Sequence, residues 1–218
     1  MLTIDHGQVP LGQEGRQAEK YAVVIKDVYT EFTIGEPVCR KSADDTVHSI
    51  QTMCGPCKYG HMTIYSDDSP EIASACHRMQ VMHNTAQPFR PETNGIAEQA
   101  VRRIKEGTAS LLVQSGLNHK WWPMAMRCFC AFMNVIDETW TGRSAYYNRF
   151  GQDAGLPFIP FGCSVDYMPS EKLVVEKLPK FGNKTLPGIF AGYELHHGGR
   201  WAQRIFVLDK ADLESAKT

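Results

Sequence analysis

The first half of the chain alternates short apolar runs with polar turns at the spacing expected for strands and helices. Runs at 1–5, 21–28 and 32–38 contain β-branched and aromatic residues, and a glycine-rich polar stretch at 6–19 separates the first two. They predict a three-stranded antiparallel meander. The segments that follow predict a helix at 41–53 capped by Ser42, a strand at 62–66, a helix at 71–79 and a short strand at 81–86.

A longer helical pattern begins after the loop RPETNG and extends to Ser115, where Gly116 predicts its end. Its apolar positions are three or four residues apart, so one face of this helix packs against the core. They are Ala97, Val101, Ile104, Thr108 and Leu111. Asn118 is predicted to cap a further apolar helix at 120–137, in which the side chains of Trp121 and Trp122 belong to the core.

Two carboxylates occupy different settings in this pattern. Asp67 lies where the predicted strand MTIYSDD opens into a turn, and Glu98 lies early in the long helix. At 100° per residue, Glu98 shares a helical face with Arg102 and Lys105. Two carboxylates about 4 Å apart repel by roughly 4 kcal/mol at an effective dielectric of 20, so acids that converge need a shared proton or a divalent cation. Carboxylate oxygens suit magnesium or manganese.

These segments carry a family resemblance. YSDDSPE resembles the "Asp, Asn, Gly, x, Glu" segment of retroviral and retrotransposon integrases, and PETNGIAEQAVRRIKEG resembles their "Pro, x, x, Asn, Gly, x, x, Glu" helix. Asp68 stands where the family often has Asn. Asp68 and Glu71 are predicted to be turn and helix-start residues rather than metal ligands.

The resemblance implies a third carboxylate on the first strand. The candidates are Asp5 in LTIDHG and Asp27 in YAVVIKDVYTEF. We choose Asp5, because the segment around Asp27 resembles the second strand of the family and because the interval from Asp5 to Asp67 accommodates two strands and a helix. Asp27 is then predicted to lie in a turn, where it accepts hydrogen bonds from Tyr29 or Thr30.

The pattern changes from Ser144 onward, where glycine, proline and aromatic residues separate short apolar runs. FGCSVDYMPSEKL, PGIFAGYELHHGG and RIFVLD resemble the small SH3-like barrel that follows the integrase core in copia-type retrotransposon polyproteins. The predicted fold is therefore α/β with a mixed sheet: a ribonuclease H-like integrase core at 1–143, a linker at 144–157 and an SH3-like β module at 158–218. His196 and His197 are predicted to lie in an exposed hairpin turn.

The resemblance implies a metal-dependent integrase of a retrotransposon polyprotein, a polynucleotidyl transferase that trims DNA 3′ ends and joins them to target DNA. Asp5, Asp67 and Glu98 would be the catalytic residues and would hold Mg²⁺ or Mn²⁺, and Asn94, Arg102 and Lys105 would contact DNA. The implied partners are element ends, target DNA and further copies of the chain, without a small-molecule cofactor. Two alternatives stay open: a decayed or repurposed fragment that only binds nucleic acid or assembles, and a ribonuclease H-like nuclease.

Composition and charge limit these interpretations. The formal net charge is −1, with 23 basic and 24 acidic residues, so any surface that grips DNA must be local. The apolar runs are too short or too interrupted to span a bilayer, which predicts an intracellular protein. The family resemblance implies that it acts in the nucleus when its substrate is chromosomal DNA. Seven cysteines at irregular spacing argue against a disulfide framework. Cys54 and Cys57 form a CxxC for which Cys76 and His77 or His83 are possible zinc partners, but we favour ordinary loop and core thiols.

Overall fold

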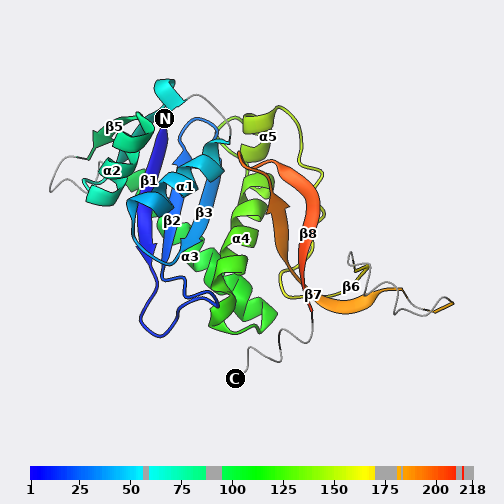
Figure 1. Ribbon diagram of the computed structural model, residues 1–218. Helices are drawn as coiled ribbons and strands as arrows, with labels where there is room; N and C mark the ends of the chain where they lie inside the picture. The colour runs from blue at the N-terminus through cyan, green and yellow to red at the C-terminus, as the bar shows by residue number, and fades with distance from the viewer. Residues whose placement is uncertain (56–58, 87–94, 170–180, 183, 210–212, 214–218) are drawn as a thin grey trace.

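The computed structural model describes residues 1–55, 59–86, 95–169, 181–182, 184–209 and 213. Two sheets and five α-helices make up this part of the chain (Figure 1). The strands of the larger sheet are β1 (Leu2–Gln8), β2 (Tyr21–Asp27), β3 (Thr33–Val38), β4 (Thr63–Ser66) and β5 (Met82–Thr85). The helices are α1 (Ala43–Cys54), α2 (Pro70–Met79), α3 (Gly95–Ser115), α4 (Trp122–Ile136) and α5 (Ala145–Phe150).

The larger sheet has the strand order β3-β2-β1-β4-β5. Strands β1, β2 and β3 form an antiparallel meander, and β4 and β5 are parallel to β1 and to each other. The predicted antiparallel meander and the mixed character of the sheet are thus confirmed, and the structure adds the places of β4 and β5 beside β1. The first strand is longer than predicted, since β1 extends to Gln8 and pairs with β2 along its whole length.

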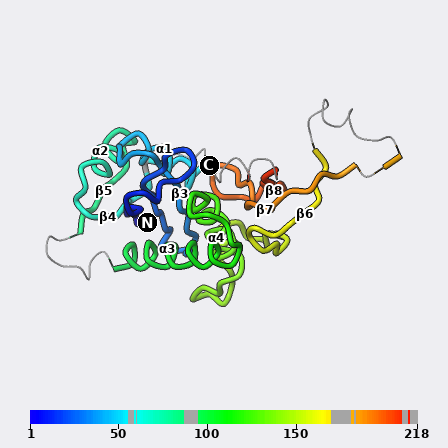
Figure 2. The backbone as a smooth tube through the Cα atoms, turned by 90° about the horizontal axis from the view of Figure 1, so that it is seen from below, coloured from blue at the N-terminus to red at the C-terminus, as the bar shows by residue number. Residues whose placement is uncertain are grey.

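Helices cover both faces of the larger sheet (Figure 2), with α1 and α2 on one side and α3 on the other. The core beneath α1 and α2 contains the fully buried Ile4, Ile25, Ile50, Met53 and Ile72. The core beneath α3 and α4 is built on Ala22 and Val24 of β2 and on Val101, Ile104 and Met126 of the helices. Among the described helices, none is both long and apolar enough to cross a membrane.

Helix ends follow the predicted capping chemistry in most places. Ser42 accepts a hydrogen bond from the backbone N–H of Asp45 at the start of α1, and Gly116 follows α3 with a left-handed φ of 66°. Asn118 caps a short 3₁₀ turn, His119–Trp121, rather than α4 itself. Pro123 then stands in the first turn of α4, where its missing N–H leaves no helical bond unmade.

The C-terminal part is a three-stranded antiparallel sheet of β6 (Ser164–Tyr167), β7 (Leu186–Leu195) and β8 (Trp201–Asp209). The exposed His196 and His197 lie in the turn between β7 and β8, as predicted. The full SH3-like barrel and the division at 143 and 158 stay predictions. Within the stretch predicted as a linker, Ser144 caps α5, and Tyr146 of α5 is buried in the core beneath α1.

Helix α4 packs between the two sheets (Figure 1). Its Met126 and Cys130 face the larger sheet, whereas Ala125 and Cys128 pack with Phe190 and Tyr193 of β7. The two tryptophans are core residues, as predicted, with exposed fractions of 3% for Trp121 and 7% for Trp122. One helix therefore contributes to both cores.

A buried asparagine joins α4 to the edge strand β3. Asn134 is 2% exposed, its Oδ1 accepts a hydrogen bond of 2.9 Å from the N–H of Thr33, and its Nδ2 donates one of 2.7 Å to the carbonyl of Thr33. These bonds satisfy backbone groups that lack a neighbouring strand. Asn134 thereby fixes the position of α4 along β3.

We predict that Asn134→Leu lowers the free energy of unfolding by about 2–4 kcal/mol, because both backbone groups of Thr33 then lose their partner in a buried setting. Urea unfolding followed by circular dichroism measures this change. Asn84→Ala, on the exposed edge strand β5, is the control and should change stability by less than about 0.5 kcal/mol. Equal effects of the two substitutions would contradict the structural role of Asn134.

Candidate functional site

Three acidic residues are positioned by β1, β4 and α3. Asp5 lies within β1, Asp67 directly follows β4, and Glu98 lies in the first turn of α3. The parallel register pairs Ile4 with Ser66. Continuing this register by one residue places Asp5 beside Asp67 on neighbouring strands, which in a sheet are about 4.8 Å apart.

The alternation of side chains places Asp5 on the α3 side of the sheet. Leu2 and Ile4 belong to the core beneath α1 and α2, so Asp5 and Gly7 face the opposite way. A Cβ at Gly7 would lie 3.2 Å from Cε of Lys105 and 3.4 Å from Cγ1 of Val101. The glycine therefore permits a close approach of α3 to β1, two residues beyond Asp5.

The electrostatics of Asp5 connect the three acids. Burial raises the pKa of the Asp5 carboxyl, and the negative charges of Asp67 and Glu98 raise it further. A 2.7 Å hydrogen bond from the N–H of His6 and the charge of Lys41 oppose this shift in the pKa. The charges of Asp67 and Glu98 thus both act on Asp5, which is the arrangement that a bound cation would relieve.

Asp67 has a buried oxygen available to a ligand. Its Oδ1 has no hydrogen-bond partner among the described residues. The backbone carbonyl of Asp67 accepts a 2.7 Å hydrogen bond from the hydroxyl of Ser66, which also contacts Nε2 of His83 at 2.8 Å. This hydrogen bond holds the backbone at Asp67 in place.

The donor set fits a hard divalent cation. Asp5 and Asp67 present carboxylate oxygens from adjacent strands, and Asp67 Oδ1 is buried without a partner. Within the described ranges, however, the acids, histidines and cysteines form no group of three or more arranged to hold a metal ion. Glu98 is exposed, and its charge raises the pKa of Asp5, but its oxygens do not complete such a group in the described residues.

Asp27 occupies a turn, as predicted. Its carboxylate accepts hydrogen bonds from the N–H of Tyr29 at 3.1 Å and from the hydroxyl of Thr30 at 2.8 Å, and Nη1 of Arg149 lies 3.8 Å away. Asp27 pairs with Leu2 at the start of β1, three residues before Asp5. Both the hydrogen bonds and the position separate Asp27 from the pair formed by Asp5 and Asp67.

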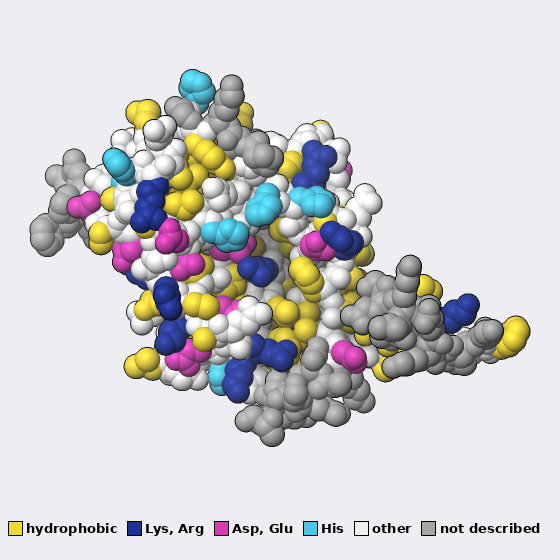
Figure 3. Space-filling model, viewed as in Figure 1, with side chains coloured by type: hydrophobic (Ala, Val, Ile, Leu, Met, Phe, Trp, Pro, Cys, Tyr) yellow, Lys and Arg dark blue, Asp and Glu magenta, His cyan; other side chains and the backbone are white. Residues whose placement is uncertain are grey.

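The residues predicted to contact DNA are only partly described. Asn94 lies outside the described residues. Arg102 and Lys105 are exposed on α3, and neither takes part in the ion pairs of the described chain, whereas their neighbour Arg103 pairs with Asp137. Arg102 and Lys105 are therefore cations available to an external anion. On the face of the molecule shown in Figure 3, basic and acidic side chains are interspersed.

Two residues near the acids were not predicted to have a role. His6 faces α1, where Nε2 lies 3.2 Å from the hydroxyl of Thr46, and burial together with the charge of Lys41 lowers its pKa despite opposing charges from Glu71 and Asp67. Glu71 lies in the first turn of α2, as predicted, but its Oε2 is buried without a hydrogen-bond partner among the described residues. The only sequence signal was that His6 follows Asp5 directly.

The cysteines of the possible zinc site are found in different settings. Cys57 lies outside the described residues, and Sγ of Cys54 contacts Sδ of Met62 at 3.4 Å. Cys76 is a core thiol, as favoured from the sequence, and burial raises its pKa to about 11. A thiol with this pKa is protonated at neutral pH.

The chain is similar in sequence to polyproteins of plant retrotransposons. The chain is 26% identical over 136 residues, 57% of its length, to the retrovirus-related Pol polyprotein from transposon TNT 1-94 of Nicotiana tabacum. It is 26% identical over 159 residues (66% of the chain) and 25% identical over 190 residues (81%) to the corresponding polyproteins from transposons RE2 and RE1 of Arabidopsis thaliana. These alignments span 9%, 10% and 12% of the relatives' lengths.

No protein family model matches the chain. Among solved structures, the catalytic core domain of BIV integrase aligns with a TM-score of 0.48 and 15% identity, covering 66% of this chain and 90% of that one. The sequence similarity to the three transposon polyproteins confirms the expected resemblance to copia-type retrotransposon polyproteins.

The raised pKa of Asp5 generates a prediction for stability. The folded protein binds this proton more tightly than the unfolded chain, so stability falls as pH rises from the ordinary carboxyl pKa through the higher folded-state pKa. We predict that Asp5→Asn raises Tm by a few degrees at pH 7, with the gain vanishing below about pH 3. Differential scanning calorimetry across this pH range measures the change.

Asp27→Asn is the matched control and should have the opposite sign at pH 7. Its carboxylate accepts two hydrogen bonds and lies near Arg149, so its replacement should lower Tm. A lower Tm for Asp5→Asn at neutral pH would contradict the electrostatic description of Asp5.

Proposed function

We propose that this chain is the catalytic core of a retrotransposon integrase, a metal-dependent polynucleotidyl transferase that processes DNA 3′ ends and joins them to target DNA. The observation that carries the proposal is the adjacency of Asp5 and Asp67 on parallel strands, with the charge of Glu98 acting on Asp5. The similarity to retrotransposon Pol polyproteins supports the DNA substrate. Because the chain spans about a tenth of those relatives, their other activities are not assigned to it.

Asp5, Asp67 and Glu98 would hold Mg²⁺ or Mn²⁺ in this proposal. When bound, the metal ions lower the pKa of water or of a DNA 3′ hydroxyl and stabilise the charge of the leaving oxygen. The two aspartates supply ligands from the rigid sheet, whereas Glu98 supplies its carboxylate from the start of α3. This division places two of the three donors on the least deformable part of the fold.

DNA would be held along α3. Arg102 lies one turn and Lys105 two turns beyond Glu98, and both are exposed, so phosphates that contact them lie beside the acids. We include Asn94 from the family resemblance. The complete reaction would also involve further copies of the chain and would take place in the nucleus when chromosomal DNA is the target.

A non-catalytic role in nucleic-acid binding or assembly is the second candidate. The net charge of −1 favours the assembly role, because proteins that grip DNA phosphates usually carry a basic excess. DNA binding without metal-dependent nicking or joining would support the non-catalytic role. Cleavage without joining would instead support a nuclease of the same fold. A strand-joining assay on short duplexes with Mg²⁺ or Mn²⁺ separates these possibilities.

We predict that Asp67→Asn and Glu98→Gln each reduce nicking and joining below a few per cent of the wild-type rate, because each change removes an anionic ligand and preserves the shape of the side chain. Chelation of the metal should have the same effect. Asp27→Asn is the control and should retain activity under conditions in which the protein is folded. Substantial activity in either site variant would refute the assignment of these acids.

A second prediction concerns the grip on DNA. Replacing both Arg102 and Lys105 by alanine should weaken binding to all sequences and lower the slope of log affinity against log salt concentration by about two units. Fluorescence anisotropy at several salt concentrations measures this slope. The control replaces Arg78 and Arg204, which form surface ion pairs with Asp44 and Glu194, and should leave the slope unchanged. If both double variants behave alike, α3 is not the DNA-binding face.

A further inference from the structure

The turn between β7 and β8 is attached to the C-terminal end of α1. The N–H of Gly198 donates a 2.7 Å hydrogen bond to the carbonyl of Thr52, and Nε of Arg149 donates one of 3.0 Å to the carbonyl of Gly198. A Cβ at Gly55, which follows α1, would lie 3.0 Å from the carbonyl oxygen of His197. The backbone of this turn is therefore held at a fixed place beside α1.

This attachment brings together two imidazoles from different elements. His48 lies one helical turn before Thr52 on α1, and His197 directly precedes Gly198. The centroids of the two rings are 6.3 Å apart, with an interplanar angle of 83°. Both side chains are exposed, and neither ring has a hydrogen-bond or ion-pair partner among the described residues. The ring nitrogens of this pair are therefore available to a ligand.

The distance between the two rings suits a shared metal ion. Imidazole nitrogens bind Zn²⁺ at about 2.0–2.1 Å, which places the centroids of two imidazoles on one ion roughly 5–6.5 Å apart. Because both rings are exposed, rotation about their side-chain bonds turns one nitrogen of each toward the same point. Among the described residues no three histidines, cysteines or acids are arranged to hold a metal ion, so two imidazoles are the protein ligands here.

The charged groups around His48 and the turn already have partners. Two guanidinium groups lie at the turn: that of Arg149 binds backbone carbonyls, and Cζ of Arg200 lies 5.3 Å from the ring centroid of Phe150. Four carboxylates that line the adjoining hollow or precede His48 on α1 are engaged as follows: Glu36 with Arg127, Glu194 with Arg204, Asp44 with Arg78 and Asp45 with the hydroxyl of Ser42. The available donors are thus neutral imidazoles, which suit Zn²⁺, Cu²⁺ or Ni²⁺ better than Mg²⁺.

We propose that His48 and His197 form a two-histidine binding site for a borderline divalent cation such as Zn²⁺. Each imidazole supplies one nitrogen ligand, and water molecules fill the remaining coordination positions. Because the ligands belong to α1 and to the turn between β7 and β8, the bound ion ties the C-terminal sheet to the larger sheet and its helices. The proposal rests on this pair alone and does not depend on the acidic residues or on the integrase reaction.

The ring Cε1–H signals of ¹³C-labelled histidines provide the first test. Titration of the full chain with Zn²⁺ should shift the two signals that are missing in His48→Ala and in His197→Ala, whereas Mg²⁺, which prefers oxygen ligands, should not. In each single variant the remaining signal of the pair should no longer shift at the same Zn²⁺ concentration, because one imidazole binds at least about tenfold more weakly than two. The amide of Gly198 should exchange more slowly with solvent when Zn²⁺ is bound.

Thermal unfolding measures the stabilisation that the ion provides. At a Zn²⁺ concentration about tenfold above its Kd, the Tm of the wild type should rise by roughly 3–6 °C more than that of His48→Ala or His197→Ala. His196→Ala is the matched control, since it removes the neighbouring exposed imidazole, and it should keep the full rise. Unshifted ring signals, a His197 signal that still shifts in His48→Ala, or an equal loss of the Tm rise in His196→Ala would overturn the proposal.

Discussion

The parallel pairing of β1 with β4 is the constraint on which the rest of the site depends. This register places Asp5 and Asp67 side by side, although they are far apart in the sequence. Gly7 completes the constraint, because the absence of a side chain allows Lys105 and Val101 of α3 to approach β1 closely. Glu98 is then carried to the same side of the sheet by the direction of the helix. Burial raises the pKa of Asp5, and the negative charges of Asp67 and Glu98 raise it further.

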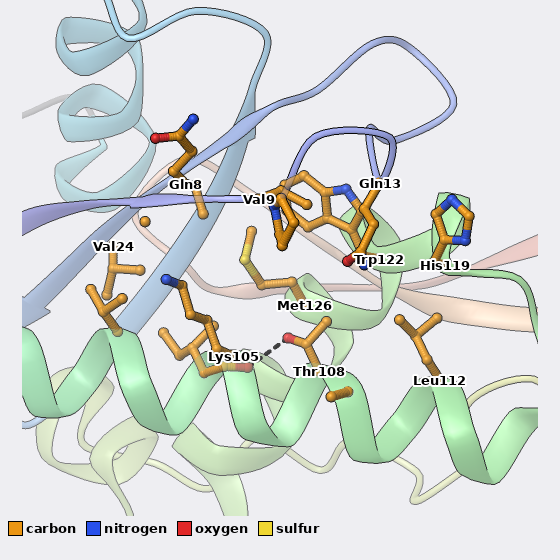
Figure 4. A pocket seen from close by; sticks show the side chains of 16 residues that line it. Gln8, Val9, Gln13, Val24, Lys105, Thr108, Leu112, His119, Trp122 and Met126 are labelled. Atoms are coloured by element: carbon orange, nitrogen blue, oxygen red, sulfur yellow. Dashed lines mark hydrogen bonds between the residues drawn. The ribbon is translucent and has the colours of Figure 1, made fainter.

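Helix α4 supports the position of α3 on the larger sheet. It packs against α3 and the larger sheet through Met126 and Cys130, and it presents its other side to Phe190 and Tyr193 of the small sheet. The hydrogen bonds of Asn134 to Thr33 add a directional contact to this otherwise apolar packing. The position of α3 relative to β1 therefore depends on residues that are remote from the acids. The packing of α3 and α4 on the larger sheet also leaves a cavity beside Trp122 (Figure 4).

Much of this fold was predictable because local signals and burial agree. Periodic apolar residues marked α3, Ser42 and Gly116 marked helix ends, and the turn at Asp27 was predicted together with its hydrogen bonds. Helix α5 was missed because six residues are too few to show a 3.6-residue period, and its burial depends on a tertiary contact of Tyr146. For the site, strand order favoured Asp5 over Asp27. The buried oxygens of Asp67 and Glu71 that lack a hydrogen-bond partner could not be predicted, because their burial depends on side-chain packing that no sequence pattern encodes.

We propose that Asp5 and Asp67 supply the ligands of a divalent-metal site that lie on the larger sheet. The most direct measurement is anomalous diffraction from crystals of the protein soaked in Mn²⁺. We predict an anomalous peak at bonding distance from carboxylate oxygens of both residues, on the side of the sheet that faces α3. In crystals saturated with Mn²⁺, an anomalous peak beside Asp27, or at any other place without contact to Asp5 and Asp67, would contradict this proposal.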